Sequence, residues 1–361
     1  MSRFYNLKVS KVEQDTDDAL TIAVEIPDHL REEFKFKQGQ YINLKKTIDG
    51  KDEIRSYSIV NAPGENQNHI EVLVKIIPEG KLSPVLQQDL KAGDMIEVMP
   101  PIGSFYANLH PTNDRTYIGL AAGSGISPVL CNIKEILIQE PQSRVYLFFG
   151  NKTKDKILKK NEIYRLEKEY GSRFRVTYIV SREKSDNPVF EGRITAEKLN
   201  ELFDLFGDIP ISETTYFICG PTDMIQSIAD FLHLEKKVPA IQILHEYYTA
   251  PDDDDDPEKS DEFKALPNIN SMVTVILDDD EYTFELNSKE EVIVDKCNNE
   301  GIPAPYSCHG GVCRTCMAQV LDGEVFMEKN FALNEEQVEQ GFILTCQAHP
   351  TTHNVTLTFD V

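Results

Sequence analysis

The chain has 361 residues, 40% of them hydrophobic, and a formal net charge of −23, which is ordinary for a protein of two or three globular domains. The acidic balance argues against a nucleic-acid partner, because phosphate recognition requires clustered Lys and Arg side chains. No run approaches the roughly 18 apolar residues of a membrane helix, and the N-terminus lacks the apolar core of a signal peptide. We therefore expect a cytoplasmic protein that does not associate with a membrane.

The first 110 residues contain short segments of β-forming residues separated by turn residues such as Gly, Pro and Asp. This pattern is typical of a small antiparallel β-barrel. The expected strands lie at 20–26, 41–46, 56–60, 69–77 and 95–100.

The rhythm changes over residues 111–248, where strand-like and helix-like segments alternate. Alternation of this kind predicts a Rossmann-like parallel sheet with helices on both faces, and ligands bind at the carboxyl ends of its strands. The expected strands are 116–121, 144–150, 175–180 and 215–220, and the expected helices are 128–140, 156–170, 195–206 and 222–235.

An acidic segment, residues 249–268, contains five consecutive aspartates and few apolar residues. Such a composition cannot bury enough apolar surface to fold alone, so we expect a flexible linker. Residues 269–361 form a third unit, with an expected hairpin at 273–286, a short helix at 290–301 and strands at 317–323 and 354–361.

The third unit also concentrates the negative charge, with 4 Lys and Arg against 16 Asp and Glu. Such a surface would attract a partner that carries a basic patch, although acidic residues also simply keep proteins soluble. We expect the partner to dock here.

Three of the seven cysteines lie in this unit, within a stretch of nine residues. Cys308, Cys313 and Cys316 follow a C-x4-C-x2-C spacing, and Cys346 comes 29 residues later. Four thiolates with this spacing are typical of a plant-type [2Fe–2S] cluster, whereas structural zinc usually takes paired knuckles. Cys297 falls outside the pattern and is expected to be buried.

The segments 305–316 and 341–350 resemble the two cluster-binding segments of plant-type ferredoxins. The resemblance covers about 90 residues and implies a β-grasp fold and a cluster near about −400 mV. It departs from many family members at Arg314–Thr315. A cation at Arg314 should favour the more negative, reduced cluster, and it could also contact a partner.

A candidate flavin site lies in the β-rich region. Arg55-Ser56-Tyr57-Ser58 is followed by VLVK at 72–75 and GKLS at 80–83. This order resembles the ferredoxin–NADP reductase family. The resemblance implies FAD rather than FMN, because the turn after Gly80 serves a dinucleotide pyrophosphate. The implied cofactor-binding residues are Arg55, Tyr57, Ser58, Lys75, Gly80, Lys81 and Ser83.

Several of these groups have a physical use in that site. The Arg55 guanidinium can form paired hydrogen bonds to the pyrophosphate, and Tyr57 offers a flat face to the flavin ring. Ser58 can hydrogen-bond N5, the atom that accepts hydride, and is therefore a candidate catalytic residue. The helix expected to begin at Gly80–Ser83 would direct free N–H groups at the pyrophosphate. The alternative is an arginine and a tyrosine that are merely exposed on a strand.

A candidate nicotinamide site begins at TYIGLAAGSGISP, residues 116–128. Gly123 and Gly125 allow a tight turn close to a pyrophosphate, and Pro128 favours the first helical turn. A glycine turn in an α/β fold without a nucleotide is the alternative.

Further along, Cys219-Gly220-Pro221 resembles the reductase segment that places a cysteine beside the nicotinamide. Glu246 lies near the end of the region, where related reductases bring a Glu to the flavin. The resemblance therefore implies catalytic roles for Cys219 and Glu246, the latter in proton transfer. A buried strand cysteine and a solvated carboxylate are the corresponding alternatives.

The residues also bear on the choice of nucleotide. NAD sites usually place an acid at the end of the second strand, and here that strand ends in Asn151–Lys152. Lys152, Ser181 and Arg182 could together hold a 2′-phosphate. We therefore favour NADPH over NADH.

The order of the three modules resembles the reductase components of multicomponent oxygenases. Residues 95–133 and 269–350 are most similar to the reductases of phenylacetyl-CoA epoxidase, whose partner is a di-iron oxygenase. The reductase of a Rieske-type aromatic-ring or steroid hydroxylase is the alternative, and a non-catalytic redox sensor is a more distant one. The implied electron path is NAD(P)H to FAD to [2Fe–2S] to an oxygenase.

Overall fold

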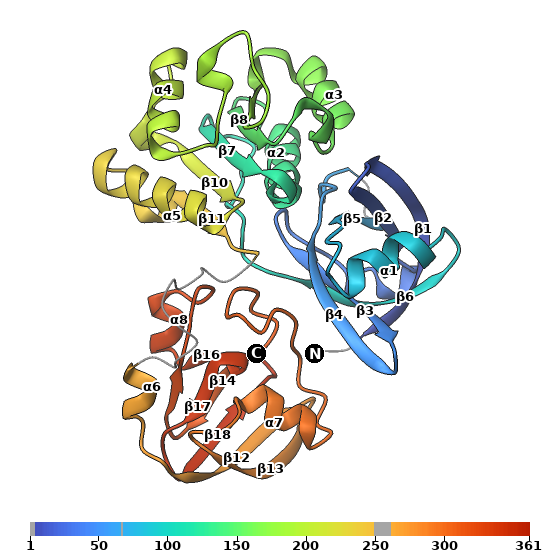
Figure 1. The fold of residues 1–361 in the computed structure, drawn as a ribbon, viewed down its shortest axis with the longest axis vertical. Helices are drawn as coiled ribbons and strands as arrows, with labels where there is room; N and C mark the ends of the chain where they lie inside the picture. The colour runs from blue at the N-terminus through green and yellow to red at the C-terminus, as the bar shows by residue number, and fades with distance from the viewer. Residues whose placement is uncertain (1–3, 66–67, 249–260) are drawn as a thin grey trace. The chain divides into compact units, whose positions relative to one another are not determined.

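The computed structural model describes residues 4–65, 68–248 and 261–361. The chain divides into two compact units, residues 4–247 and the part that begins at Tyr248; Figure 1 shows the fold of each. None of the helices in the described residues is long and apolar enough to span a membrane.

The first unit begins with the predicted antiparallel barrel. Its six strands run in the order β4-β3-β6-β1-β2-β5, and pairing between Ile59 and Val72 joins the two outer strands. Alternate apolar side chains fill the interior, among them Leu7, Ile22 and Ile42. The elements are β1 Tyr5–Thr16, β2 Ala19–Glu25, β3 Tyr41–Ile48, β4 Lys51–Ser58, β5 His69–Lys75, α1 Leu82–Asp89 and β6 Met95–Ile102.

The same unit continues into a five-stranded parallel sheet of order β11-β10-β7-β8-β9. Apolar residues of α2 and α3 pack on one face, and those of α4 and α5 on the other. This confirms the predicted Rossmann-like layers. The strands are β7 Thr116–Ala122, β8 Arg144–Asn151, β9 Phe174–Val180, β10 Thr215–Cys219 and β11 Ile243–Glu246. The helices are α2 Ile126–Gln139, α3 Lys160–Tyr170, α4 Ala196–Phe206 and α5 Thr222–Asp230, which a π-helix, Phe231–Glu235, extends.

The second unit holds a five-stranded sheet of order β13-β12-β18-β14-β16, in which β12 and β18 are parallel. Helix α7 contributes Ile293, Val294 and Cys297 to the core beneath this sheet, so Cys297 is buried as predicted. The elements are β12 Asn270–Leu277, β13 Asp280–Asn287, α7 Ile293–Asn299, β14 Met317–Asp322, β15 Val325–Met327, α8 Glu335–Glu339, β16 Phe342–Leu344, β17 Ala348–Pro350 and β18 Asn354–Thr358.

The predicted acidic linker, residues 249–268, differs from the structure in its last part. Residues 249–260 lie outside the described residues. Asp261–Ala265 form helix α6, in which Phe263 is 4% exposed and its ring centroid lies 4.9 Å from that of His349. The last part of the predicted segment therefore contains a short helix, and one aromatic side chain among its acids is buried against the domain that follows.

Candidate functional site

The four predicted cluster ligands come together in the second unit. Cys308, Cys313 and Cys316 lie in the loop between α7 and β14, and Cys346 follows β16. Hydrogen bonds from the Cys313 and Cys346 thiols lower the pKa of Cys308, and the same contacts raise the pKa of Cys313 and Cys346. Cys346 also contacts Cys316. The sequence therefore folds into one group of four thiols.

This donor set fits a [2Fe–2S] cluster. Cys308 contacts both Cys313 and Cys346, and Cys346 also contacts Cys316. Four thiolates that lie this close together are the ligand set that two bridged irons need. The Gly310 N–H, 3.4 Å from the Cys308 sulfur, donates to it, as is typical of cluster sulfurs.

Residues 328–333 support the cysteine loop from outside. The Gly311 carbonyl accepts from the Phe331 N–H at 3.1 Å, and a Cβ on Gly311, whose φ is +73°, would lie 3.1 Å from the Lys329 carbonyl oxygen. Arg314 has a left-handed φ of 57°, and its Nε donates to the Ala332 carbonyl at 2.6 Å. Arg314 therefore helps to fix the loop that carries the ligands, a role that its sequence position alone did not indicate.

The predicted flavin residues gather on β4 and the start of α1. The Glu53 carboxylate lies between two of them, 3.1 Å from the Arg55 guanidinium and 2.8 Å from the Lys81 ammonium. Hydrogen bonding from Lys81 and the charge of Arg55 lower the pKa of Glu53 despite partial burial. Two cations held side by side by one carboxylate suit a pyrophosphate dianion. Glu53 lies two residues before Arg55 on the same face of the strand, a signal that the sequence analysis missed.

The remaining flavin residues occupy different surroundings. Tyr57 is half-buried, and burial raises its pKa, so the phenol stays neutral. Gly80 closes a turn onto Ile77 at 2.8 Å, and the Ser83 hydroxyl accepts from the Ile77 N–H at 3.1 Å. Ser83 thus shapes the turn that opens α1. The Lys75 ammonium forms an ion pair with the Asp18 carboxylate at 2.6 Å, so a carboxylate of the barrel already balances its charge.

The two predicted nicotinamide segments touch each other. Gly123, with φ +55°, and Gly125 form a 3-10 turn before α2, and Pro128 lies in the first turn of that helix. A Cβ on Gly125 would lie 2.1 Å from the Cys219 carbonyl oxygen. A Cβ on Gly220 would lie 2.6 Å from the Met224 methyl. Close backbone packing therefore requires glycine at Gly125, where the carboxyl ends of β7 and β10 meet, whereas at Gly220 the Met224 methyl could move aside.

Ser58 and Glu246 meet although 188 residues separate them. The Ser58 hydroxyl donates to the Glu246 carboxylate at 3.1 Å, and Glu246 of β11 is the register partner of Cys219 at the end of β10. Cys219 is fully buried. The three predicted catalytic residues thus lie together, where the barrel meets the nucleotide domain.

The residues predicted to hold a 2′-phosphate lie at the ends of β8 and β9. The Arg182 backbone N–H donates to the Lys152 carbonyl at 2.9 Å, and the Ser181 backbone N–H donates to the Asn151 carbonyl at 2.9 Å. Lys152, Ser181 and Arg182 are exposed. Glu183 follows directly and accepts from the Lys154 N–H at 3.2 Å. The residues at the strand ends, from which the 2′-phosphate site was predicted, gave no indication of this carboxylate.

Comparisons with known proteins agree with this geometry. The Oxidoreductase FAD-binding domain family matches residues 6–106, the Oxidoreductase NAD-binding domain family residues 120–230, and the 2Fe-2S iron-sulfur cluster binding domain family residues 275–351. The chain is 34% identical over 365 residues to a subunit of the 1,2-phenylacetyl-CoA epoxidase of Escherichia coli strain K12, covering 100% of this chain and 99% of that protein. The chain belongs to the same family as that epoxidase component. It is an oxidoreductase of the ferredoxin reductase type that binds FAD, a nicotinamide nucleotide and a [2Fe–2S] cluster.

Other proteins are similar to this chain over its whole length. This chain is 29% identical to the 3-ketosteroid-9-alpha-monooxygenase ferredoxin reductase component of Rhodococcus rhodochrous, over 99% of this chain and 97% of that one. Its fold is that of phthalate dioxygenase reductase, with a TM-score of 0.59 at 18% identity, over 99% of this chain and 98% of the other. The predicted fold class is therefore confirmed.

Proposed function

We propose that this reductase supplies electrons to the di-iron oxygenase of a phenylacetyl-CoA epoxidase system in phenylacetate degradation, in the cytoplasm. One observation carries the proposal, namely the 34% identity, from end to end, to a component of such an epoxidase. A reductase for a Rieske-type steroid or aromatic-ring hydroxylase is the second candidate, because the 3-ketosteroid monooxygenase reductase component also matches over 99% of the chain.

We assign a separate role at the flavin to each of several residues of the first unit. FAD, when bound here, would supply a group that can take two electrons together and give them up singly, as a cluster that takes one at a time requires. Arg55 and Lys81 would hold its pyrophosphate, and Tyr57 would offer a flat ring face to the flavin. With FAD bound, the single Ser58 hydroxyl hydrogen would turn from Glu246 toward N5, and the Ser58 oxygen could then accept from a protonated Glu246. Glu246, 3.1 Å from the Ser58 hydroxyl, holds the proton that must follow the electrons.

NADPH is the proposed hydride donor. Lys152 and Arg182 place two positive charges at the ends of adjacent strands, and Ser181 adds a hydroxyl beside them. A 2′-phosphate carries the charge that these groups would neutralise. Cys219 and Gly220 lie at the end of β10, next to the glycine turn that holds the pyrophosphate of the same nucleotide.

The oxygenase is proposed to dock on the acidic second unit. Acidic side chains lie on or beside α7 and α8, two helices of the domain that carries the cluster: Glu290, Glu291, Asp295, Glu300, Glu335, Glu336 and Glu339. A partner with a basic patch would be drawn to them over long distances, and the attraction would weaken with salt.

Reconstitution tests the proposed partner. The reductase, loaded with FAD and cluster, is mixed with the purified oxygenase of a phenylacetyl-CoA epoxidase, NADPH and phenylacetyl-CoA, and the epoxide is measured. A parallel mixture contains the oxygenase of a 3-ketosteroid monooxygenase and its steroid. We expect turnover in the first mixture, at a rate that falls with added salt. Turnover in the second mixture alone would favour the alternative partner. If the loaded reductase, assayed without an oxygenase, does not reduce cytochrome c with NADPH or NADH, a redox sensor would be favoured.

A further inference from the structure

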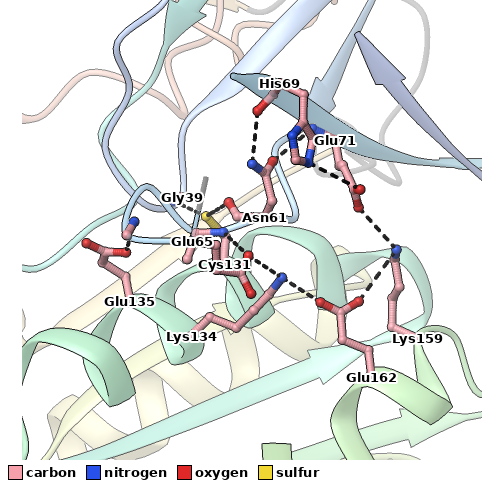
Figure 2. Close-up of polar contacts among 12 residues, drawn as sticks. Gly39, Asn61, Glu65, His69, Glu71, Cys131, Lys134, Glu135, Lys159 and Glu162 are labelled. Carbon is pink, nitrogen blue, oxygen red and sulfur yellow. Dashed lines mark hydrogen bonds and ion pairs between the residues drawn. The ribbon is translucent and has the colours of Figure 1, made fainter. Parts of the chain in front are cut away.

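A buried polar network joins the flavin barrel to the nucleotide domain (Figure 2). Helix α2, which begins directly after the glycine turn of the nicotinamide site, presents Cys131, Lys134 and Glu135 on one face, as residues spaced by three and four do. All three side chains are buried. They contact residues 61–65, the loop that follows the flavin strand β4. The network therefore connects the segments next to both cofactor sites.

Three contacts hold the loop against the helix. The Cys131 thiol donates to the Asn61 carbonyl at 3.1 Å, and the Gly64 N–H donates to Glu135 at 2.7 Å. The Lys134 ammonium donates to Glu65 at 3.1 Å. Asn61 is in turn fixed to β5, because its side chain bonds the backbone of His69 and Glu71. The loop is thus held on both sides.

Lys134 is the charged centre of this arrangement. It is 2% exposed and pairs with Glu65 of the barrel and, at 2.5 Å, with Glu162 of α3. Burial alone would lower the pKa of Lys134, but the Glu162 and Glu65 carboxylates outweigh it and raise the pKa. The side chain is therefore a buried cation shared between the two domains.

A second lysine extends the same bridge. Lys159, 8% exposed, lies 3.6 Å from Glu162 and 4.0 Å from Glu71 of the barrel. Its backbone N–H also donates to the Asp15 carboxylate of β1 at 2.9 Å. Carboxylates of the barrel thus face ammonium groups of the nucleotide domain at several points. Such complementary charges fix orientation and register more than they add net stability.

We propose that Lys134 is a positioning residue for hydride transfer. By tying α2 to the loop 61–65, it sets the nicotinamide against the flavin before the nucleotide binds. The loop begins three residues after Ser58, and Lys134 follows Gly125 by nine residues, about two and a half helical turns. A displacement at this contact therefore shifts one cofactor site relative to the other. The inference rests on the proposed roles of those two sites.

The test uses the full chain loaded with FAD and cluster. Anaerobic stopped-flow measurement with NADPH gives the limiting rate of flavin reduction and the nucleotide Kd separately. We expect Lys134→Met to lower the limiting rate about 10- to 100-fold, since a displacement near 1 Å can cost that much. The Kd, the FAD content and the cluster absorbance should stay close to those of the wild-type protein. Lys134→Arg should restore part of the rate.

Two further variants keep the inference falsifiable. Glu65→Gln retains an oxygen for the Ala62 N–H but loses the charge that faces Lys134, and should lower the limiting rate less than Lys134→Met does. If Lys134→Met does not fold, the limiting rate of flavin reduction in Glu65→Gln tests the proposal instead. Lys198→Met removes a lysine that pairs within α4 and should leave the rate unchanged.

Two outcomes separate the possible failures. An unchanged limiting rate with a lower melting temperature, or a raised Kd alone, would show that Lys134 only stabilises the fold or the nucleotide site. Wild-type protein that neither NADPH nor NADH reduces would instead overturn the proposed function itself.

Discussion

Gly125→Ala tests whether the contact between the glycine turn and the end of β10 positions the nicotinamide. Gly125 has a φ of −59°, which alanine adopts without strain. The obstacle is space, because the new Cβ would lie 2.1 Å from the Cys219 carbonyl oxygen and 2.5 Å from its carbon. Non-bonded carbon contacts need about 3.5 Å. The two backbones must therefore separate by roughly 1 Å or more.

A shift of this size should slow hydride transfer in a protein that still folds. Overpacking of this kind costs about 1–3 kcal/mol of folding free energy. A displacement near 1 Å at the reacting groups costs about 100-fold in rate, or about 2.7 kcal/mol in the barrier. The assay is anaerobic stopped-flow reduction of the flavin by saturating NADPH. Dithionite should still reduce both flavin and cluster, because neither site is touched.

Gly171→Ala is the matched control. Gly171 also lies in the nucleotide domain, with a φ of +55° and nothing within 4 Å of an added Cβ. It should lose about 1–3 kcal/mol of stability, because a φ of +55° with a ψ of −123° is adopted readily only by glycine, and it should keep the wild-type rate. Folded Gly125→Ala protein that reduces its flavin as fast as the wild type would refute the reasoning.

Three other changes address separate parts of the chain. Cys346→Ser should abolish the cluster, leaving a yellow protein whose flavin NADPH still reduces; red-brown colour with bound iron and sulfide would contradict the ligand set. Arg182→Ala should raise the Kd for NADPH about 10-fold, the loss of one charge-assisted hydrogen bond, and leave that for NADH unchanged, whereas equal effects on both would exclude a 2′-phosphate contact. Burial raises the pKa of Asp15, so the unfolded carboxyl ionises first as the pH rises and folding stability then falls. Asp15→Asn should therefore raise the melting temperature at pH 7 and lose this gain in acid, and an equal gain at pH 3 would rule out ionisation as its cause.

Local patterns were sufficient to predict most elements of the fold. The expected helix at 128–140 corresponds to α2, and the expected strand at 215–220 to β10. Strand β1, Tyr5–Thr16, was not predicted, because charged residues interrupt its apolar positions. It is held as a strand by pairing with β2 and β6, and the pairing with β6 depends on the closure of the barrel. Helix α6 was missed for a related reason, since a single Phe263 gains its burial from His349, far along the chain.

The candidate site shows the same division between short-range and long-range information. Ser58 and Glu246 were each found in a short segment, but their 3.1 Å contact depends on how the barrel and the parallel sheet pack. Glu53 was missed although it lies near Arg55, because an acid beside a proposed phosphate ligand looks unfavourable in a sequence. In the structure it holds Arg55 and Lys81 at a common point.

The polar character of the interface between barrel and nucleotide domain follows from what hydride transfer requires. Apolar surfaces can pack in several registers with similar energies, whereas a buried ammonium between two carboxylates has few arrangements that leave no charge unpaired. Lys134 between Glu65 and Glu162 therefore selects one orientation of α2 on the barrel. Because α2 also begins at the glycine turn, the orientation that satisfies these charges also fixes where that turn lies relative to the barrel.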